Sequence, residues 1–204
     1  MPIVHVQEGF SVAADPYIEP DRQRSVFDAD LGGAGVLAFH VFVENKSGKP
    51  TIIRRSDMSL TPPEGTRIGP ESANSAAVKV GESGSVVAAS LAFGIVGALV
   101  AGSAEDSARN ARIADYRSKE FPEQTFAKDQ AAQGFVFFIP PPGTKPFDAA
   151  TLTVRFVDAE SGAVQSVDVP LAALKFTGAP TPRGTSAPPP TWGGGVCDPA
   201  RGQC

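Results

Sequence analysis

The sequence has few of the side chains that bind metals or carry acid–base catalysis. Its 204 residues include two histidines, His5 and His40, and two cysteines, Cys197 and Cys204. No second histidine, cysteine or carboxylate lies at metal-ligand spacing from either histidine, so we expect no metal and no cofactor. His40 lies inside an apolar stretch, which is typical of a histidine packed in a core or at a sheet edge.

A basic surface is also lacking. Lys and Arg number 18 against 22 Asp and Glu, which gives a net charge of −4, and the two signs are mixed along the chain. Binding to nucleic acid requires a basic stripe that faces the phosphates. We therefore expect no nucleic-acid partner.

Catalytic motifs are absent as well. Residues 81–85 read Gly-Glu-Ser-Gly-Ser, which departs from the nucleophile pattern Gly-x-Ser-x-Gly and does not follow a buried strand. The glycines of DLGGAGV at 30–36 lack the spacing of a dinucleotide-binding loop and precede a strand. We therefore expect no enzymatic activity and assign no catalytic residue.

The two ends of the chain do not decide in which cellular compartment the protein lies. The start, MPIVHVQEGFSV, has neither a charged region nor an apolar region of a signal peptide, so the protein is either cytoplasmic or the mature form of an exported one. Cys197 and Cys204 are spaced to close a small disulfide loop in an oxidising compartment, but two free thiols are the alternative.

The rest of the sequence favours β-structure. The 21 glycines and 19 prolines indicate many turns. Val36–Val43 is apolar on both faces, which fits a central strand of a sandwich. We expect further strands in IVHV near the start, in TIIRRSDMSLTPPEG, in GFVFFI and in a hairpin around DAESG at 158–162.

Residues 85–120 are predicted to be helical, as one long helix or as a hairpin bent near Gly102. Residues 69–85 are small and polar and are interpreted as a connection into this region. Residues 103–121 contain no glycine or proline and alternate in charge, and Pro122 ends them.

Strands on both sides of the helical region must pair with each other, because neither half alone makes a covered sheet. The sequence therefore predicts a mainly β fold. We expect an immunoglobulin-like β-sandwich in residues 1–177, interrupted by a helical insertion at about 84–121. A Pro/Gly-rich extended tail is expected in 178–204.

The succession of FHVFVENKSGKPTIIRRSDMSL, a glycine-zipper segment, RIADYRSKEF and GFVFFIPPPG resembles small bacterial envelope proteins, many of them lipoproteins. The resemblance covers residues 35–170. It implies an envelope location and a non-catalytic structural or binding role. The sequence departs from a lipoprotein precursor because it has no lipobox cysteine near its start.

One stretch, VVAASLAFGIVGALVAG at 86–102, bears most directly on function. From Ser83 to Ala104 there are 22 residues without a charge, and a helix of that length spans about 33 Å against about 30 Å of hydrocarbon. A line of small residues four apart forms one smooth helix face that another backbone can approach. The candidate interaction residues are Ser90, Gly94, Gly97, Ala98 and Gly102.

The sequence leaves three alternatives for what contacts that face: the rest of the same domain, a membrane, or another protein chain. A single membrane crossing is disfavoured, because it would place the two β halves on opposite sides of the bilayer. Trp192 in the tail either anchors a partner or folds back on its own domain. We expect an envelope protein that assembles with itself or with a membrane-protein partner, and a membrane surface is a further candidate partner. The alternative is a soluble ligand- or carbohydrate-binding sandwich whose core contains the helix.

Overall fold

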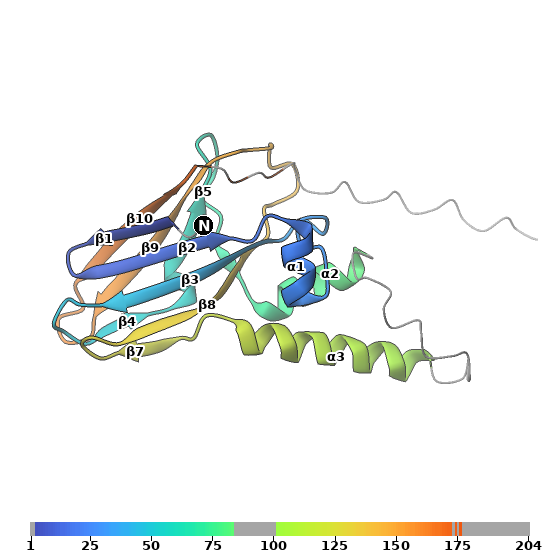
Figure 1. The fold of residues 1–204 in the computed structure, drawn as a ribbon, viewed down its shortest axis with the longest axis horizontal. Coiled ribbons are helices and arrows are strands. Elements are labelled where there is room, and N and C mark those ends of the chain that lie inside the picture. The colour runs from blue at the N-terminus through green and yellow to red at the C-terminus, as the bar shows by residue number, and fades with distance from the viewer. Residues whose placement is uncertain (1–2, 84–100, 173, 175, 177–204) are drawn as a thin grey trace, which may run out of the picture.

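The computed structural model describes residues 3–83, 101–172, 174 and 176, which form two antiparallel sheets and three α-helices (Figure 1). The first sheet contains, in spatial order, β1 (Ile3–Gln7), β2 (Phe10–Pro16), β3 (Leu37–Asn45), β8 (Ala131–Phe138) and β6 (Pro70–Glu71). The second contains β10 (Val164–Leu171), β9 (Ala150–Asp158), β4 (Thr51–Ile53) and β7 (Gln124–Phe126), with β5 (Met58–Thr61) also paired to β9. A 3-10 turn, η1 (Arg55–Asp57), joins β4 to β5.

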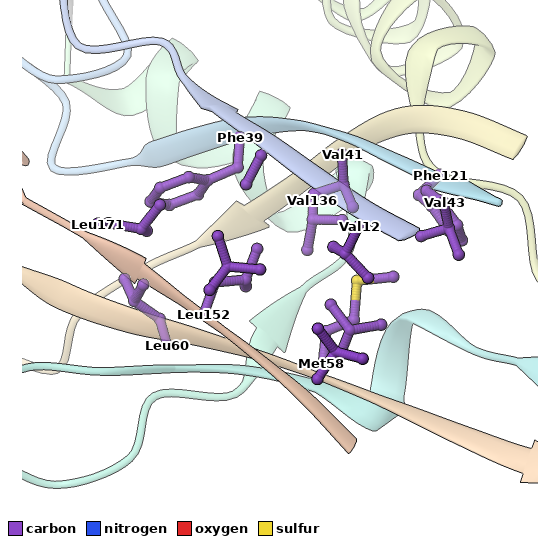
Figure 2. Packing of buried hydrophobic residues seen from close by; sticks show 14 of the residues in the cluster. Val12, Phe39, Val41, Val43, Met58, Leu60, Phe121, Val136, Leu152 and Leu171 are labelled. Carbon is purple, nitrogen blue, oxygen red and sulfur yellow. The ribbon is translucent and has the colours of Figure 1, made fainter. Parts of the chain in front are cut away.

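The two sheets pack face to face through a shared apolar core (Figure 2). Along β3, alternate residues from Leu37 to Val43 point into this core, and along β9 Leu152, Val154 and Phe156 do the same. Phe10 of the first sheet stacks on Phe156 of the second with ring centroids 4.0 Å apart. The period-two pattern of the strands therefore buries one face of each sheet against the other.

A second apolar core lies on the outer face of the first sheet, under the helices α1 (Pro20–Phe27), α2 (Ala73–Glu82) and α3 (Ala101–Lys119). Phe135 and Phe137 of β8 point into it, whereas Val136 and Phe138 point into the core between the sheets. Burial on both faces explains why the second half of β8, from Gly134 to Phe138, is a continuous apolar run without polar alternation.

Most of the predicted strands are confirmed. The structure has strands at the first segment, at 37–45, at 51–53 and 58–61, at 131–138 and in the hairpin of β9 and β10. It also has elements that the sequence did not predict. These are β2, β6, β7, α1 in the segment interpreted as turns, and α2 in the segment interpreted as a connection.

The chain pairs across the helical insertion in both sheets. β3, which precedes the insertion, pairs with β8, which follows it, from Leu37↔Phe138 to Glu44↔Ala131. β5 and β9 pair in the same way in the second sheet. The two halves of the sequence therefore form one β body, as predicted. The immunoglobulin-like topology stays a prediction, and the predicted tail at 178–204 lies outside the described residues.

Candidate functional site

The two helices of the insertion, α2 and α3, lie side by side in opposite directions. At the start of α2, the backbone N–H of Ala73 donates to Glu120, just beyond the end of α3, at 2.7 Å. In the last turn of α2, a Cβ at Gly81 would lie 2.5 Å from Nη1 of Arg112. The chain therefore reverses between residues 83 and 101. α3 begins at Ala101, one residue before Gly102, and residues 84–100 lie outside the described part of the chain, so the predicted bend near Gly102 stays a prediction.

Glu120 holds together the end of the helix pair at which α2 begins and α3 ends, called the base below. Besides accepting the N–H of Ala73, its carboxylate forms an ion pair with Arg55 of η1, and the two side chains are 17% and 23% exposed. A carboxylate at a helix N-terminus also interacts favourably with the helix dipole. Ser72 completes the cap, since its Oγ accepts the N–H of Ser75 at 3.0 Å. One acidic side chain thus joins α2, the end of α3 and the second sheet.

Aromatic packing holds the same end of α3 on the sheet. Tyr116 is fully buried, with its ring 5.0 Å from Phe27 of α1 and 5.8 Å from Phe137 of β8. Burial raises the pKa of Tyr116. Its hydroxyl has no hydrogen-bond partner among the described residues. Tyr116 therefore acts as an apolar anchor and is not placed to act as an acid or a base.

The other half of α3 projects beyond these contacts. All side chains from 106 to 111 are exposed, and in Figure 1 α3 extends past the sheets. Where α2 still runs beside α3, the helices leave a groove of about 420 Å³. Its lining residues are Val78, Gly81, Glu82, Ala108, Arg109 and Arg112. The helix pair is therefore anchored at its base, whereas the side chains of α3 from 106 to 111 are exposed.

Most of the residues predicted for interaction lie outside the described residues. These are Ser90, Gly94, Gly97 and Ala98 in the uncharged segment, Trp192, and the cysteines Cys197 and Cys204. Gly102 lies in the first turn of α3. Within the described part of the chain, the helices are all too short or too polar to cross a membrane.

Sequence reasoning missed α2, although two signals for it are present. Ser72 is a good N-cap residue, and the buried side chains Ala73, Ala76, Ala77 and Val80 follow the i, i+3, i+4, i+7 spacing of one helix face. That face consists mostly of alanines, so it resembled a connection of small residues.

A second group of polar residues lies on the first sheet near α1. Asp15 and Arg22 form an ion pair, with Nη1 2.9 Å from Oδ1, and the guanidinium lies 3.7 Å from the ring centroid of Tyr17. The hydrogen bond from Arg22 lowers the pKa of Asp15. Burial lowers the pKa of His40, whose ring lies 4.9 Å from Phe135. His40 is thus placed as a histidine packed on the sheet, as expected.

A cavity of about 180 Å³ adjoins this group. Its lining includes Ile3, Asp15, Ile18, Arg22, Leu171 and Leu174. Glu19 also lines the cavity, so its wall combines apolar side chains with charged ones, of which Asp15 and Arg22 are paired with each other. In the described residues, no three His, Cys, Asp or Glu side chains gather closely enough to hold a metal ion.

These features define the class of the protein: a mainly β body of two antiparallel sheets that carries an antiparallel helix pair. No family model matches the chain, and no curated protein matches it.

Three solved structures of bacterial proteins are similar to it. A candidate lipoprotein of Bacillus subtilis has 11% identity and a TM-score of 0.41 over 85% of this chain, which spans 39% of that protein. A candidate ApaA protein of Bordetella pertussis has 15% identity and a TM-score of 0.33, over 84% of this chain and 95% of the other. A Listeria monocytogenes protein of unknown function has 10% identity and a TM-score of 0.35, over 84% and 82%. Similarities at this level assign neither a family nor an activity.

Proposed function

We propose that this chain is a non-catalytic assembly protein of the bacterial cell envelope. It binds another copy of itself or a membrane-protein partner through the small-residue face formed by Ser90, Gly94, Gly97, Ala98 and Gly102. Trp192 in the tail adds a second contact. The observation that supports this proposal is the antiparallel pairing of α2 and α3, which are anchored at Glu120 and whose ends at residues 83 and 101 flank the uncharged segment in the sequence.

The sheet pairing supports the mode of interaction. Because β3 pairs with β8 and β5 with β9 across the insertion, the folded body cannot be divided between two sides of a bilayer. The antiparallel helices let the chain leave and re-enter the body from the same end. Residues 84–100 can then meet a membrane or another helix while both sheets stay intact. Small residues at such a contact allow backbones to approach closely.

The experiment is a mass measurement on the full chain, with and without detergent. Replacing Gly94 and Ala98 by leucine fills the proposed contact face, so we expect the binding of detergent and vesicles, and any assembly that detergent disperses, to be lost while the far-UV circular dichroism stays unchanged. Ile95→Leu is the matched control, because it keeps the volume of a large side chain off that face, and it should assemble as the native chain does.

Two outcomes contradict the proposal. One is a native chain that is monomeric at every concentration and does not bind detergent or vesicles. The other is loss of the folded β signal in the leucine variant, which would place the segment inside the core, where added volume is costly. The second outcome would favour the alternative of a soluble ligand-binding sandwich. Fractionation of cells that express the native gene tests the envelope location separately.

A further inference from the structure

The strand β1 forms the outer edge of the first sheet. In the described residues β2 is its only sheet neighbour, and Val4, His5, Val6 and Gln7 are all exposed. β10 of the second sheet also lies beside β1, yet these side chains remain accessible. An edge strand with free backbone groups is a template for pairing with another strand.

The register shows which backbone groups face outward. Lys46 N–H donates to Gly9 C=O at 2.6 Å, and Tyr17 N–H donates to Ala38 C=O at 2.9 Å. In β2 the odd-numbered residues therefore bond toward β3, and the even-numbered ones bond toward β1. Since Val4 pairs with Ala13 and Val6 with Ser11, neither valine bonds to β2. Their N–H and C=O groups point away from the sheet.

This edge lacks the features that usually prevent strands from pairing. The sequence Ile-Val-His-Val-Gln has no lysine, no proline and no formal charge, whereas β10 contains Asp168 and Pro170 and β6 contains Pro70. On the outer face, Val4 and Val6 are 59% and 69% exposed.

We infer that β1 pairs with β1 of a second copy of this chain, antiparallel and centred on His5. The strand is symmetric about that residue, so Val4 of one copy lies opposite Val6 of the other. Each outward N–H of these valines then donates to an outward C=O of its counterpart. The exposed valine side chains pack against each other across the junction. A partner strand of unrelated sequence would not place a valine opposite each exposed valine of β1, so a second copy of this chain fits best.

The register gives a sharp test by cross-linking. In this arrangement the two copies of His5 form a non-hydrogen-bonded pair, with Cα atoms about 4.5 Å apart, inside the roughly 4.4–6.8 Å range of a disulfide. The two copies of Gln7 are offset by about 14 Å along the strands. In the full chain with Cys197→Ser and Cys204→Ser, His5→Cys should form a covalent dimer under mild oxidation, and Gln7→Cys should stay monomeric.

A second pair of variants tests the hydrogen bonds. Val6→Pro removes an N–H that β2 does not use, so we expect a twofold fall in solution mass with the β signal retained. Val6→Thr, which keeps the N–H and the strand preference, should remain dimeric. A native chain that is monomeric at every concentration, or equal cross-linking at positions 5 and 7, overturns the inference. The dimer should also persist in Gly94→Leu, so its failure is distinguishable from failure of the proposed function.

Discussion

Gly134 lies in β8 where the chain leaving α3 passes against the sheet. Phe121 N–H donates to Phe135 C=O at 2.9 Å, and Glu120 and Phe135 form a parallel bridge. A Cβ at position 134 would lie 2.5 Å from Cα and 2.7 Å from the backbone N of Phe121. Both contacts are with backbone atoms, which cannot rotate away as the end of a side chain can. Alanine at this position must therefore push the two segments apart.

The loss of folding stability in Gly134→Ala follows from that displacement. Ordinary carbon contacts lie at about 3.5–4.0 Å, so the segments must separate by about 1 Å. Overpacking of this kind costs about 1–3 kcal/mol. For a chain of this size, the melting temperature should fall by about 2–4 °C for each kcal/mol. The movement would also displace Glu120, which joins Arg55 to the start of α2.

The assay is urea and thermal unfolding of Gly134→Ala, followed by circular dichroism. Gly69→Ala is the matched control, because a Cβ there meets nothing within 4 Å and its φ lies outside the positive range. Removing a glycine also restricts the unfolded chain, so the control should be neutral or more stable by up to about 1 kcal/mol. If Gly134→Ala is as stable as Gly69→Ala, the close approach of β8 to Phe121 is not present in solution.

Three further substitutions test individual side chains by unfolding experiments. Asn45 is fully buried and its amide donates to Lys49 C=O at 2.7 Å, so Asn45→Asp, which places a carboxylate there, should destabilise the protein at pH 7 more than Asn45→Ala does. Hydrogen bonds from the backbone of Ser161 and Glu160 lower the pKa of Asp158 from 3.8 to about 2. Its stabilising effect is therefore fully present above pH 3.8 and lost as the pH falls toward 2, and the difference in stability between the native chain and Asp158→Asn should shrink over that interval. Because the buried hydroxyl of Tyr116 has no partner among the described residues, Tyr116→Phe should be at least as stable as the native chain, and a loss above about 1 kcal/mol would show that the hydroxyl is bonded.

The sequence predicted the strands whose pattern is local. β9 alternates Leu152, Val154 and Phe156 with polar residues, and β8 is apolar from Gly134 to Phe138, so each indicates a strand on its own. β2 was missed because its alternation is weak. Of its inward residues Phe10, Val12 and Ala14, the last is small, and the side chains at its outward positions are only half-exposed. α1 was missed because Pro20 suggested a turn, although proline is well accommodated in the first turn of a helix.

The base of the helix pair could not be predicted in the same way. Arg55 and Glu120 are 65 positions apart in the sequence, and their pairing depends on how η1, α2 and the end of α3 are brought together by both sheets. Nothing in the local pattern around either residue distinguishes it from a solvated surface charge. The close approach at Gly134 is equally non-local, because the atoms that exclude a side chain belong to Phe121.

The two proposed contacts are geometrically compatible. Antiparallel pairing of β1 with its copy places a twofold axis perpendicular to the sheet at His5, and such an axis keeps the outer face of both copies on the same side. The helix layer covers part of that face in each copy, over Phe135 and Phe137, while β1 is the outermost strand of this sheet in the described residues. A β1 dimer would therefore present two helix pairs on one face of a continuous sheet. Two linked contacts with one membrane or one partner bind more strongly than either alone, provided that both can reach it. Val6→Pro should then weaken vesicle or partner binding of the full chain even though residue 6 is remote in sequence from the uncharged segment.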